Sequence, residues 1–161
     1  MRLAICRLHA VGWVFHYSGN MNESGGEREL HEDRDKRVLV VADDAELASK
    51  LPRLVEIAGG RPFLATTRAA LREAVAAYMP FDLVVTELIM SWITGLGVVH
   101  ACVFDEPVPV VFVAPQGLNL GQPTAASWVR VVRKPLVAEE CIATFTQSLS
   151  DAKRSGVHRV G

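Results

Sequence analysis

The chain has 161 residues, of which 50% are hydrophobic and 22% charged, with a formal net charge of −1 at neutral pH. This length suits one domain, and the composition excludes a collagenous, disulfide-stapled or largely disordered protein. A net charge near zero supplies no sequence-wide basic field, so nucleic acid is not an expected partner.

The cysteines and the apolar runs indicate the compartment. Cys6, Cys102 and Cys141 lie far apart and form no CxxC pair, which predicts reduced thiols in a cytoplasmic protein. The longest uncharged apolar run, residues 107–115, has about half of the roughly 20 residues that cross a bilayer. Charged and polar residues also interrupt the start of the chain, so we expect neither a membrane span nor a secretion signal.

Residues 1–36 differ from the rest of the chain. They end in the segment MNESGGERELHEDRDK, which has many charges and almost nothing to bury, and this predicts a flexible polar leader. Met21 stands where a chain could begin, which raises the hypothesis that residues 1–20 are an upstream extension of the reading frame. The expected domain then covers residues 37–153 and is followed by a tail at residues 154–161.

Within the expected domain, short apolar runs alternate with segments of helical spacing. The expected strands cover residues 38–42, 62–66, 82–88, 108–113 and 128–133, and the expected helices cover residues 43–58, 67–79, 95–104 and 137–152. This alternation predicts right-handed βαβ crossovers and an α/β fold with a doubly wound parallel sheet, in which residues 62–66 form an edge strand.

Two segments do not follow the pattern. Pro52 lies inside the first expected helix, which it should kink or break. Gly117, Gly121 and Pro123 interrupt the place where a helix should join the last two strands. We therefore predict a loop over residues 115–124, with at most a short helix after it.

Polar residues follow the strands at the edge where such sheets usually carry their function. Asp43 and Asp44 follow the first strand, Glu87 ends the third, Ala114 ends the fourth and Lys134 follows the fifth. Three carboxylates and one lysine could converge there in an acidic pocket. Taken alone, such an aspartate pair is more often a helix N-cap with its first-turn acid than a metal site.

At these positions the chain resembles a known family, the receiver domain of two-component response regulators. VLVVADDAEL, FDLVVTELIMSWITGLGVV, VPVVFVA and VRVVRKPLVAEE are similar to its successive signatures, over about residues 37–152. The separation of 44 residues between Asp43 and Glu87 also suits that family. The resemblance implies a five-stranded flavodoxin-like, CheY-like (βα)5 fold with a shortened fourth helix, and it places Glu87 at the phosphoacceptor position.

The chain departs from the family at most of the positions that carry its chemistry. Only Asp43 and Lys134 keep the family's residue type. Receivers usually have a second acid after the first strand, an aspartate as phosphoacceptor, a hydroxyl residue after the fourth strand and an aromatic switch before the lysine. The residues found at these four positions are Ala42, Glu87, Ala114 and Val131.

These departures predict poor phosphotransfer. The extra methylene of Glu87 displaces its oxygens by roughly 1 Å or more from the attack position, and such a misplacement can cost about 100-fold in rate. The same extension carries the carboxylate toward Lys134, which makes Glu87 either a phosphoryl mimic or a relic. We expect Mg²⁺ to bind weakly if at all, through Asp43, Glu87 and the Ile89 carbonyl, and we expect no other cofactor.

The first functional hypothesis is a stand-alone degenerate receiver that is not an enzyme and acts by binding a signalling protein, such as a histidine kinase or an output protein. Resemblance implies docking or homodimerisation through the face of the fourth helix, fifth strand and fifth helix, near residues 118–128 and the last helix. The first helix, where kinases approach receivers, is the competing surface.

Two alternatives stay open. One is a single-domain response regulator that still accepts phosphate from a histidine kinase, on Glu87 or on Thr86 or Ser91; Thr86 should face away from Glu87. The other is a small flavodoxin-like enzyme or cofactor carrier, for which the sequence offers no phosphate-cradling loop. Trp92 is either a partner anchor or a lid on local apolar surface.

Overall fold

The computed structural model describes residues 35–102, 108–118 and 128–155, with the backbone alone for residues 153–155. Most of the predicted leader and tail, and residues 119–127 of the predicted loop and short helix, lie outside the described residues. The prediction of a shortened fourth helix falls on that segment and is not addressed by the described residues.

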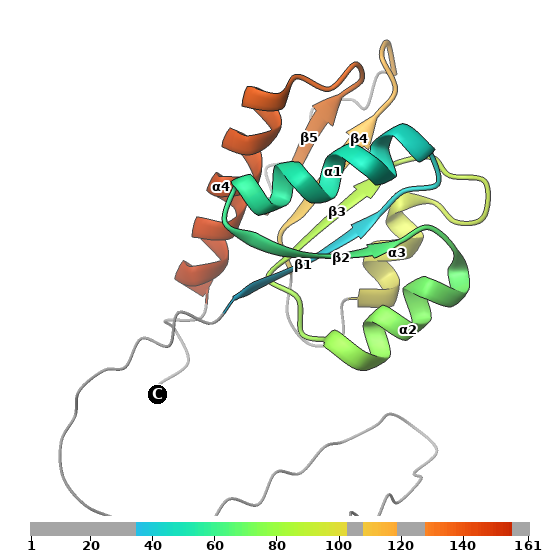
Figure 1. The fold of residues 1–161 in the computed structure, drawn as a ribbon, viewed down its shortest axis with the longest axis horizontal. Coiled ribbons are helices and arrows are strands. Elements are labelled where there is room, and N and C mark those ends of the chain that lie inside the picture. Colours follow the sequence, from blue (N-terminus) through green and yellow to red (C-terminus); the bar gives the residue numbers. More distant parts are fainter. Residues whose placement is uncertain (1–34, 103–107, 119–127, 156–161) are drawn as a thin grey trace, which may run out of the picture. The chain divides into compact units, whose positions relative to one another are not determined.

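The described residues form one parallel sheet with helices on both faces (Figure 1). The elements in chain order are β1 (Lys36–Val41), α1 (Ala45–Ile57), β2 (Gly60–Ala65), α2 (Arg68–Tyr78), β3 (Leu83–Glu87), α3 (Gly95–Cys102), β4 (Val110–Ala114), β5 (Val129–Arg133) and α4 (Ala138–Ser155). The strand order is β2-β1-β3-β4-β5, and every pairing is parallel. The predicted doubly wound sheet, with its second strand at an edge, is confirmed.

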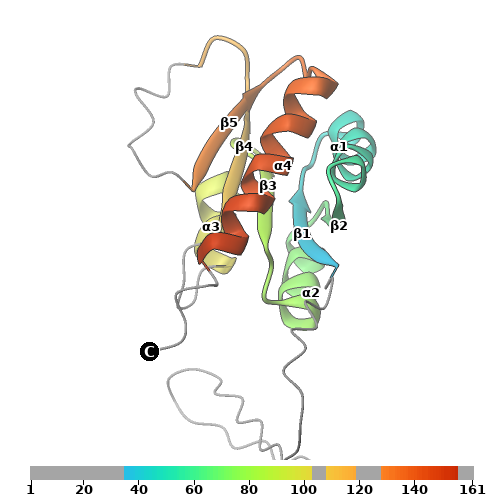
Figure 2. The same cartoon turned by 90° about the vertical axis from the view of Figure 1, so that its left-hand side faces the viewer.

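The sheet separates two apolar clusters. Side chains alternate along a strand, so Val38 and Val40 of β1 lie on the face covered by α1 and α4, whereas Leu39 and Val41 lie on the face covered by α2 and α3. The view in Figure 2 shows these layers on either side of the strands. All five residues of β3 and all five of β4 are buried, so the polar residue that ends β3 is placed in a largely apolar interior.

Helix α1 begins where the sequence predicts and is not interrupted at Pro52. The side chain of Asp44 caps its N-terminus, and the helix runs through Pro52 to Ile57. The expected break is wrong because Leu51 and Val55, on either side of the proline, are fully buried against the sheet. Burial of each side chain contributes about 1.5–3 kcal/mol, which offsets the roughly 3 kcal/mol that an interior proline costs.

The loop after β3 is held by a close approach of backbone. The Gly95 N–H donates to the Leu88 carbonyl at 2.9 Å. A Cβ atom on Gly95 would lie 2.7 Å from the Glu87 carbonyl oxygen and 3.0 Å from the Phe112 ring. Only glycine lets the first turn of α3 come this close to β3, and this contact fixes the loop of residues 88–94.

In the part of the chain that the structure describes, no helix is long and apolar enough to span a membrane.

Candidate functional site

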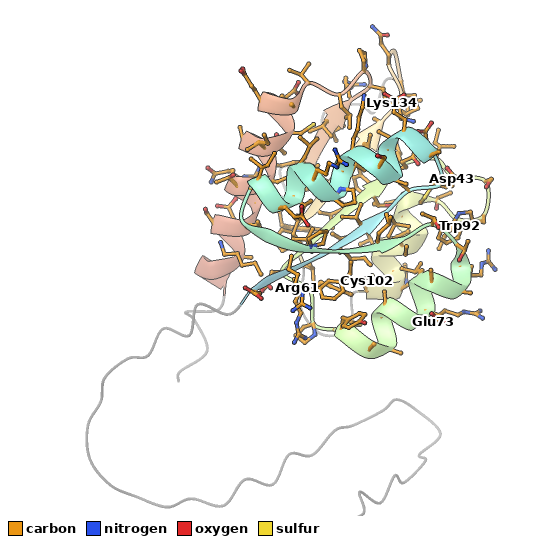
Figure 3. The ribbon with its side chains drawn as sticks, in the orientation of Figure 1. Asp43, Arg61, Glu73, Trp92, Cys102 and Lys134 are labelled. Atoms are coloured by element: carbon orange, nitrogen blue, oxygen red, sulfur yellow. The ribbon has the colours of Figure 1, made fainter. Side chains whose placement is uncertain are left out.

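The carboxyl ends of β1, β3 and β5 bring together the four residues that we call the strand-end site: Asp43, Asp44, Glu87 and Lys134. Asp43 and Asp44 connect β1 to α1, Glu87 is the last residue of β3, and Lys134 follows β5. Asp43 and Lys134 lie at the same end of the sheet in Figure 3. The predicted convergence is therefore real in the fold, and the hydrogen bonds decide what each group does there.

Glu87 is the buried centre of the site. Its side chain is only 4% exposed. One carboxylate oxygen, Oε2, accepts from the backbone N–H of Asp43 at 3.0 Å and from that of Asp44 at 3.1 Å. The other, Oε1, accepts from the Lys134 ammonium at 2.9 Å. Charge-assisted bonds from these three donors offset part of the cost of burying the carboxylate.

Lys134 reaches this carboxylate from the surface. Its backbone N–H donates to the Ala114 carbonyl at 3.0 Å, which continues the β4–β5 pairing by one residue and sets where the side chain begins. The side chain is 34% exposed, so it is partly in contact with water. The ion pair thus has one buried partner and one partly hydrated partner.

The Asp43 carboxylate binds Ser91 on the loop after β3. Its Oδ2 accepts from the Ser91 backbone N–H at 2.6 Å and from the Ser91 hydroxyl at 2.7 Å. These two bonds, the amide first, lower the pKa of Asp43 from its ordinary value of 3.8. Asp43 is therefore ionised at neutral pH, and its hydrogen bonds with Ser91 connect the β1–α1 loop to the β3–α3 loop.

Asp44 contributes its backbone to the site but its carboxylate to the helix. Its Oδ1 accepts from the N–H groups of Glu46 at 2.9 Å and Leu47 at 3.0 Å, which is N-cap geometry. Of the two interpretations of the aspartate pair, capping describes Asp44, whereas Asp43 has the Ser91 contact instead. Of the residues predicted to form an acidic pocket, Asp44 and Lys134 border a hollow of about 300 Å³, whose lining does not include Asp43 or Glu87.

The positions that differ from the receiver pattern are mostly buried. Ala42 and Ala114 are completely buried, and each places a methyl group where the resemblance calls for a polar side chain. Val131 is half-buried and packs against the cluster on the α2 and α3 face. Neither Ala114 nor Val131 carries a polar atom or a ring that could respond to a change at Glu87.

The other residues considered from the sequence occupy clear positions. The hydroxyl of Thr86 is buried and donates to the Glu87 carbonyl at 3.0 Å, so it is not available as an acceptor. Ile89 forms an isolated bridge with Thr94, and its side chain is exposed. Trp92 packs against the cluster on the α2 and α3 face, and its buried indole N–H has no hydrogen-bond partner among the described residues. The position of Trp92 favours the lid interpretation over a partner anchor.

The receiver fold implies Mg²⁺ at this edge, but the residues present do not fit it. Both oxygens of Glu87 and Oδ2 of Asp43 already accept hydrogen bonds. An ammonium 2.9 Å from Glu87 would repel a cation bound to the same carboxylate. Among residues 35–102, 108–118 and 128–152, no group of three or more His, Cys, Asp or Glu side chains could hold a metal ion.

Comparison with known proteins gives matches among solved structures only. No protein-family model and no curated protein matches the chain. A response regulator receiver domain protein from Clostridium thermocellum superposes with a TM-score of 0.61 at 20% identity, covering 74% of this chain and 98% of that one. The receiver domain of the hybrid histidine kinase CckA gives 0.56 at 23% identity, covering 70% and 98%.

The receiver domain of the PhyR response regulator from Erythrobacter litoralis gives a TM-score of 0.60 at 27% identity, covering 72% of this chain and 91% of that one. The described part of this chain therefore has the fold of response regulator receiver domains. That Glu87 occupies the phosphoacceptor position, and that Ala42, Ala114 and Val131 replace an acid, a hydroxyl residue and an aromatic switch, stays a prediction from the resemblance.

Sequence reasoning found the four residues of the strand-end site but not all of their partners. Ser91 was considered only as an acceptor of phosphate, whereas its amide and hydroxyl bind a carboxylate 48 residues away. The backbone N–H groups that bind Glu87 could not be recognised from the sequence, because they do not depend on the type of side chain. A serine in the loop after β3, four residues beyond the site carboxylate, was the one available signal.

Proposed function

We propose that this chain is a receiver-fold protein-interaction module of two-component signalling that works without being phosphorylated. One observation carries the proposal: both oxygens of the Glu87 carboxylate are occupied by donors of the chain itself. The module is not an enzyme in this proposal, and its cysteine pattern supports a cytoplasmic location.

Phosphoryl transfer to a carboxylate needs an oxygen that can attack the donor in line. Oε1 of Glu87 is bound to the Lys134 ammonium, Oε2 is bound to two amides, and the residue is 3% exposed. Attack would require breaking at least one charge-assisted bond, each worth about 1.5–3 kcal/mol. The longer side chain of Glu87 also displaces its oxygens from the attack position. Both the occupied oxygens and this displacement therefore disfavour Glu87 as a phosphoacceptor.

The readout of a phosphoryl group is also absent from these positions. A switch needs an element with two arrangements whose balance the modification changes. Ala114 offers no hydroxyl and Val131 no ring, while the Glu87–Lys134 pair joins β3 to the start of the β5–α4 connection. We therefore treat the domain as held in one arrangement, in which binding surfaces are always presented.

The proposed partner is a signalling protein such as a histidine kinase or an output protein. The similarity to a receiver domain that belongs to a hybrid histidine kinase supports this class of partner. A partner or a second copy docking near residues 118–128, β5 and α4 stays a prediction, since most of residues 118–128 lie outside the described range. The competing surface on α1 has a hollow of about 300 Å³ bordered by Leu47, Lys50 and Lys134.

The test is an amide NMR spectrum recorded before and after addition of acetyl phosphate and Mg²⁺. We expect the amide signals of Asp43, Asp44 and Lys134 to stay in place, because nothing is transferred to Glu87. Shifts at these amides that reverse when the donor is exhausted would favour the alternative, a regulator that still accepts phosphate. Glu87→Asp, which shortens the side chain, is the matched variant in which a response can reappear.

A further inference from the structure

A groove of about 470 Å³ lies between α2 and α3, on the face of the sheet away from α1 and α4. The residues that line it are Arg68, Leu71, Arg72, Val75, Ala76, Ile93 and Ala101. We name it the α2–α3 groove. It shares no lining residue with the strand-end site.

The α2 wall of the groove combines apolar and basic side chains on one helix face. Positions 68, 71, 72, 75 and 76 follow the spacing i, i+3, i+4, i+7 and i+8, which aligns them along a single stripe. Leu71 is buried beneath the groove and Val75 is half-buried, whereas Arg68 and Arg72 are exposed. The wall therefore has an apolar base and two guanidinium groups one turn apart at its rim.

The wall opposite α2 is formed by Ile93, just before α3, and by the small side chain of Ala101 on α3. Ile93 packs directly over Gly97, where an added Cβ atom would come within 2.8 Å of it. Ala101 lies one turn further along the same face and lines the groove. No bulky side chain of α3 fills the space opposite the arginines, so the backbone of another helix can approach there.

The charges at the rim indicate which partner fits. Arg68 uses one guanidinium nitrogen to donate to the Trp92 carbonyl at 2.6 Å and keeps its other donors. By contrast, the hollow beside α1 includes Asp44 and Glu46, and its Lys50 is already paired with Glu46. The α2–α3 groove thus offers apolar area framed by positive charge, which complements an apolar stripe framed by carboxylates.

We propose that the α2–α3 groove binds an acidic amphipathic helix of a partner protein, with about two turns of its apolar stripe against Leu71, Val75 and Ile93 and its carboxylates on Arg68 and Arg72. Helices bind grooves in this way through anchors at i, i+3, i+4 and i+7. The inference rests on the proposed interaction function and names one surface and one partner chemistry for it.

The experiment uses a fluorescent synthetic 14-residue helix with leucine on one face and glutamate on the others, measured by anisotropy with the full chain. Arg72→Glu should weaken binding by roughly tenfold, as expected for a reversed charge at an interface. Arg53→Glu, the same change at an exposed position on α1, should alter the affinity by less than about twofold, since rim charges far from a contact contribute little.

Ala76→Glu places a carboxylate in the groove at an exposed position, where folding is not at risk, and it should also weaken binding. Equal effects of Arg72→Glu and Arg53→Glu, equal affinity for a peptide with lysine in place of glutamate, or no binding at 1 mM peptide would each overturn the proposal. Phosphorylation of the chain with this binding pattern intact would refute the proposed function and leave the groove proposal standing.

Discussion

Replacement of Glu87 by alanine should be much more costly than replacement of its ion-pair partner. The carboxylate accepts from two backbone amides and one ammonium while its side chain is 4% exposed. Hydrogen bonds to charged groups contribute about 1.5–3 kcal/mol each, but the two amides belong to exposed residues and can recover part of this from water. We expect Glu87→Ala to lower the free energy of unfolding by about 3 kcal/mol, because three hydrogen bonds to a charged group are lost and only part of that loss is recovered from water.

Lys134→Met removes the ammonium and keeps the apolar stem. At 2.9 Å the gross attraction is about 6 kcal/mol for an effective dielectric constant of about 20. Desolvation and the hydration of a side chain that is 34% exposed offset most of that energy. The two amides still hold Glu87 after the substitution, so the expected loss is about 1 kcal/mol.

Urea unfolding followed by circular dichroism at pH 7 measures both losses as shifts of the midpoint. Glu46→Ala is the matched control, because Glu46 forms an exposed ion pair with Lys50 and should change the stability by less than about 0.5 kcal/mol. A loss for Lys134→Met that equals or exceeds the loss for Glu87→Ala would refute the assignment of Glu87 as the buried, multiply bonded partner.

Three further outcomes follow from the same contacts. Ser91 lowers the pKa of Asp43, so the contribution of Asp43 to stability is present above the unfolded value of 3.8 and is lost as the pH falls through the lower folded value. Asp43→Asn should therefore reduce the loss of stability that urea titrations measure between pH 5 and pH 2. The same loss of stability in the variant and the unmodified chain over this range would contradict the contact. Burial raises the pKa of Cys102 to about 11, so iodoacetamide should modify it only in the unfolded protein, and rapid labelling of native protein at pH 8, located by peptide mass, would contradict its burial. Mg²⁺ should give no saturable change in tryptophan fluorescence up to about 10 mM, because the carboxylates that would bind it already accept hydrogen bonds. A fluorescence titration with a midpoint at micromolar Mg²⁺ would show that the site opens for the ion.

The fold was predictable because the information that specifies it is local. The apolar runs at residues 38–41 of β1, 83–85 of β3 and 110–114 of β4 have no polar interruption, which is typical of strands covered on both faces. The N-cap at Asp44 and the turn at Gly59, with a φ of +87°, are also signalled by residue type. Pro52 was misjudged because the cost of a proline is a local quantity, whereas the burial that offsets it comes from the sheet.

The strand-end site was predictable in membership but not in bonding. Strand ends show which side chains meet at one edge of a parallel sheet, and this placed Asp43, Glu87 and Lys134 together. Which donor each carboxylate takes depends on loop geometry, and the Asp43 contact with Ser91 arises between two loops that are distant in sequence. The two carboxylates are therefore held by separate donors, Asp43 by Ser91 and Glu87 by two backbone amides and Lys134.

Intact-mass spectrometry after incubation with acetyl phosphate and Mg²⁺ shows directly whether Glu87 accepts a phosphoryl group. We expect the unmodified chain to gain none, because both oxygens of Glu87 are held by the chain's own donors. Glu87→Asp is the variant in which partial acceptance can return. A stoichiometric gain of one phosphoryl group that disappears in Glu87→Ala would contradict the account.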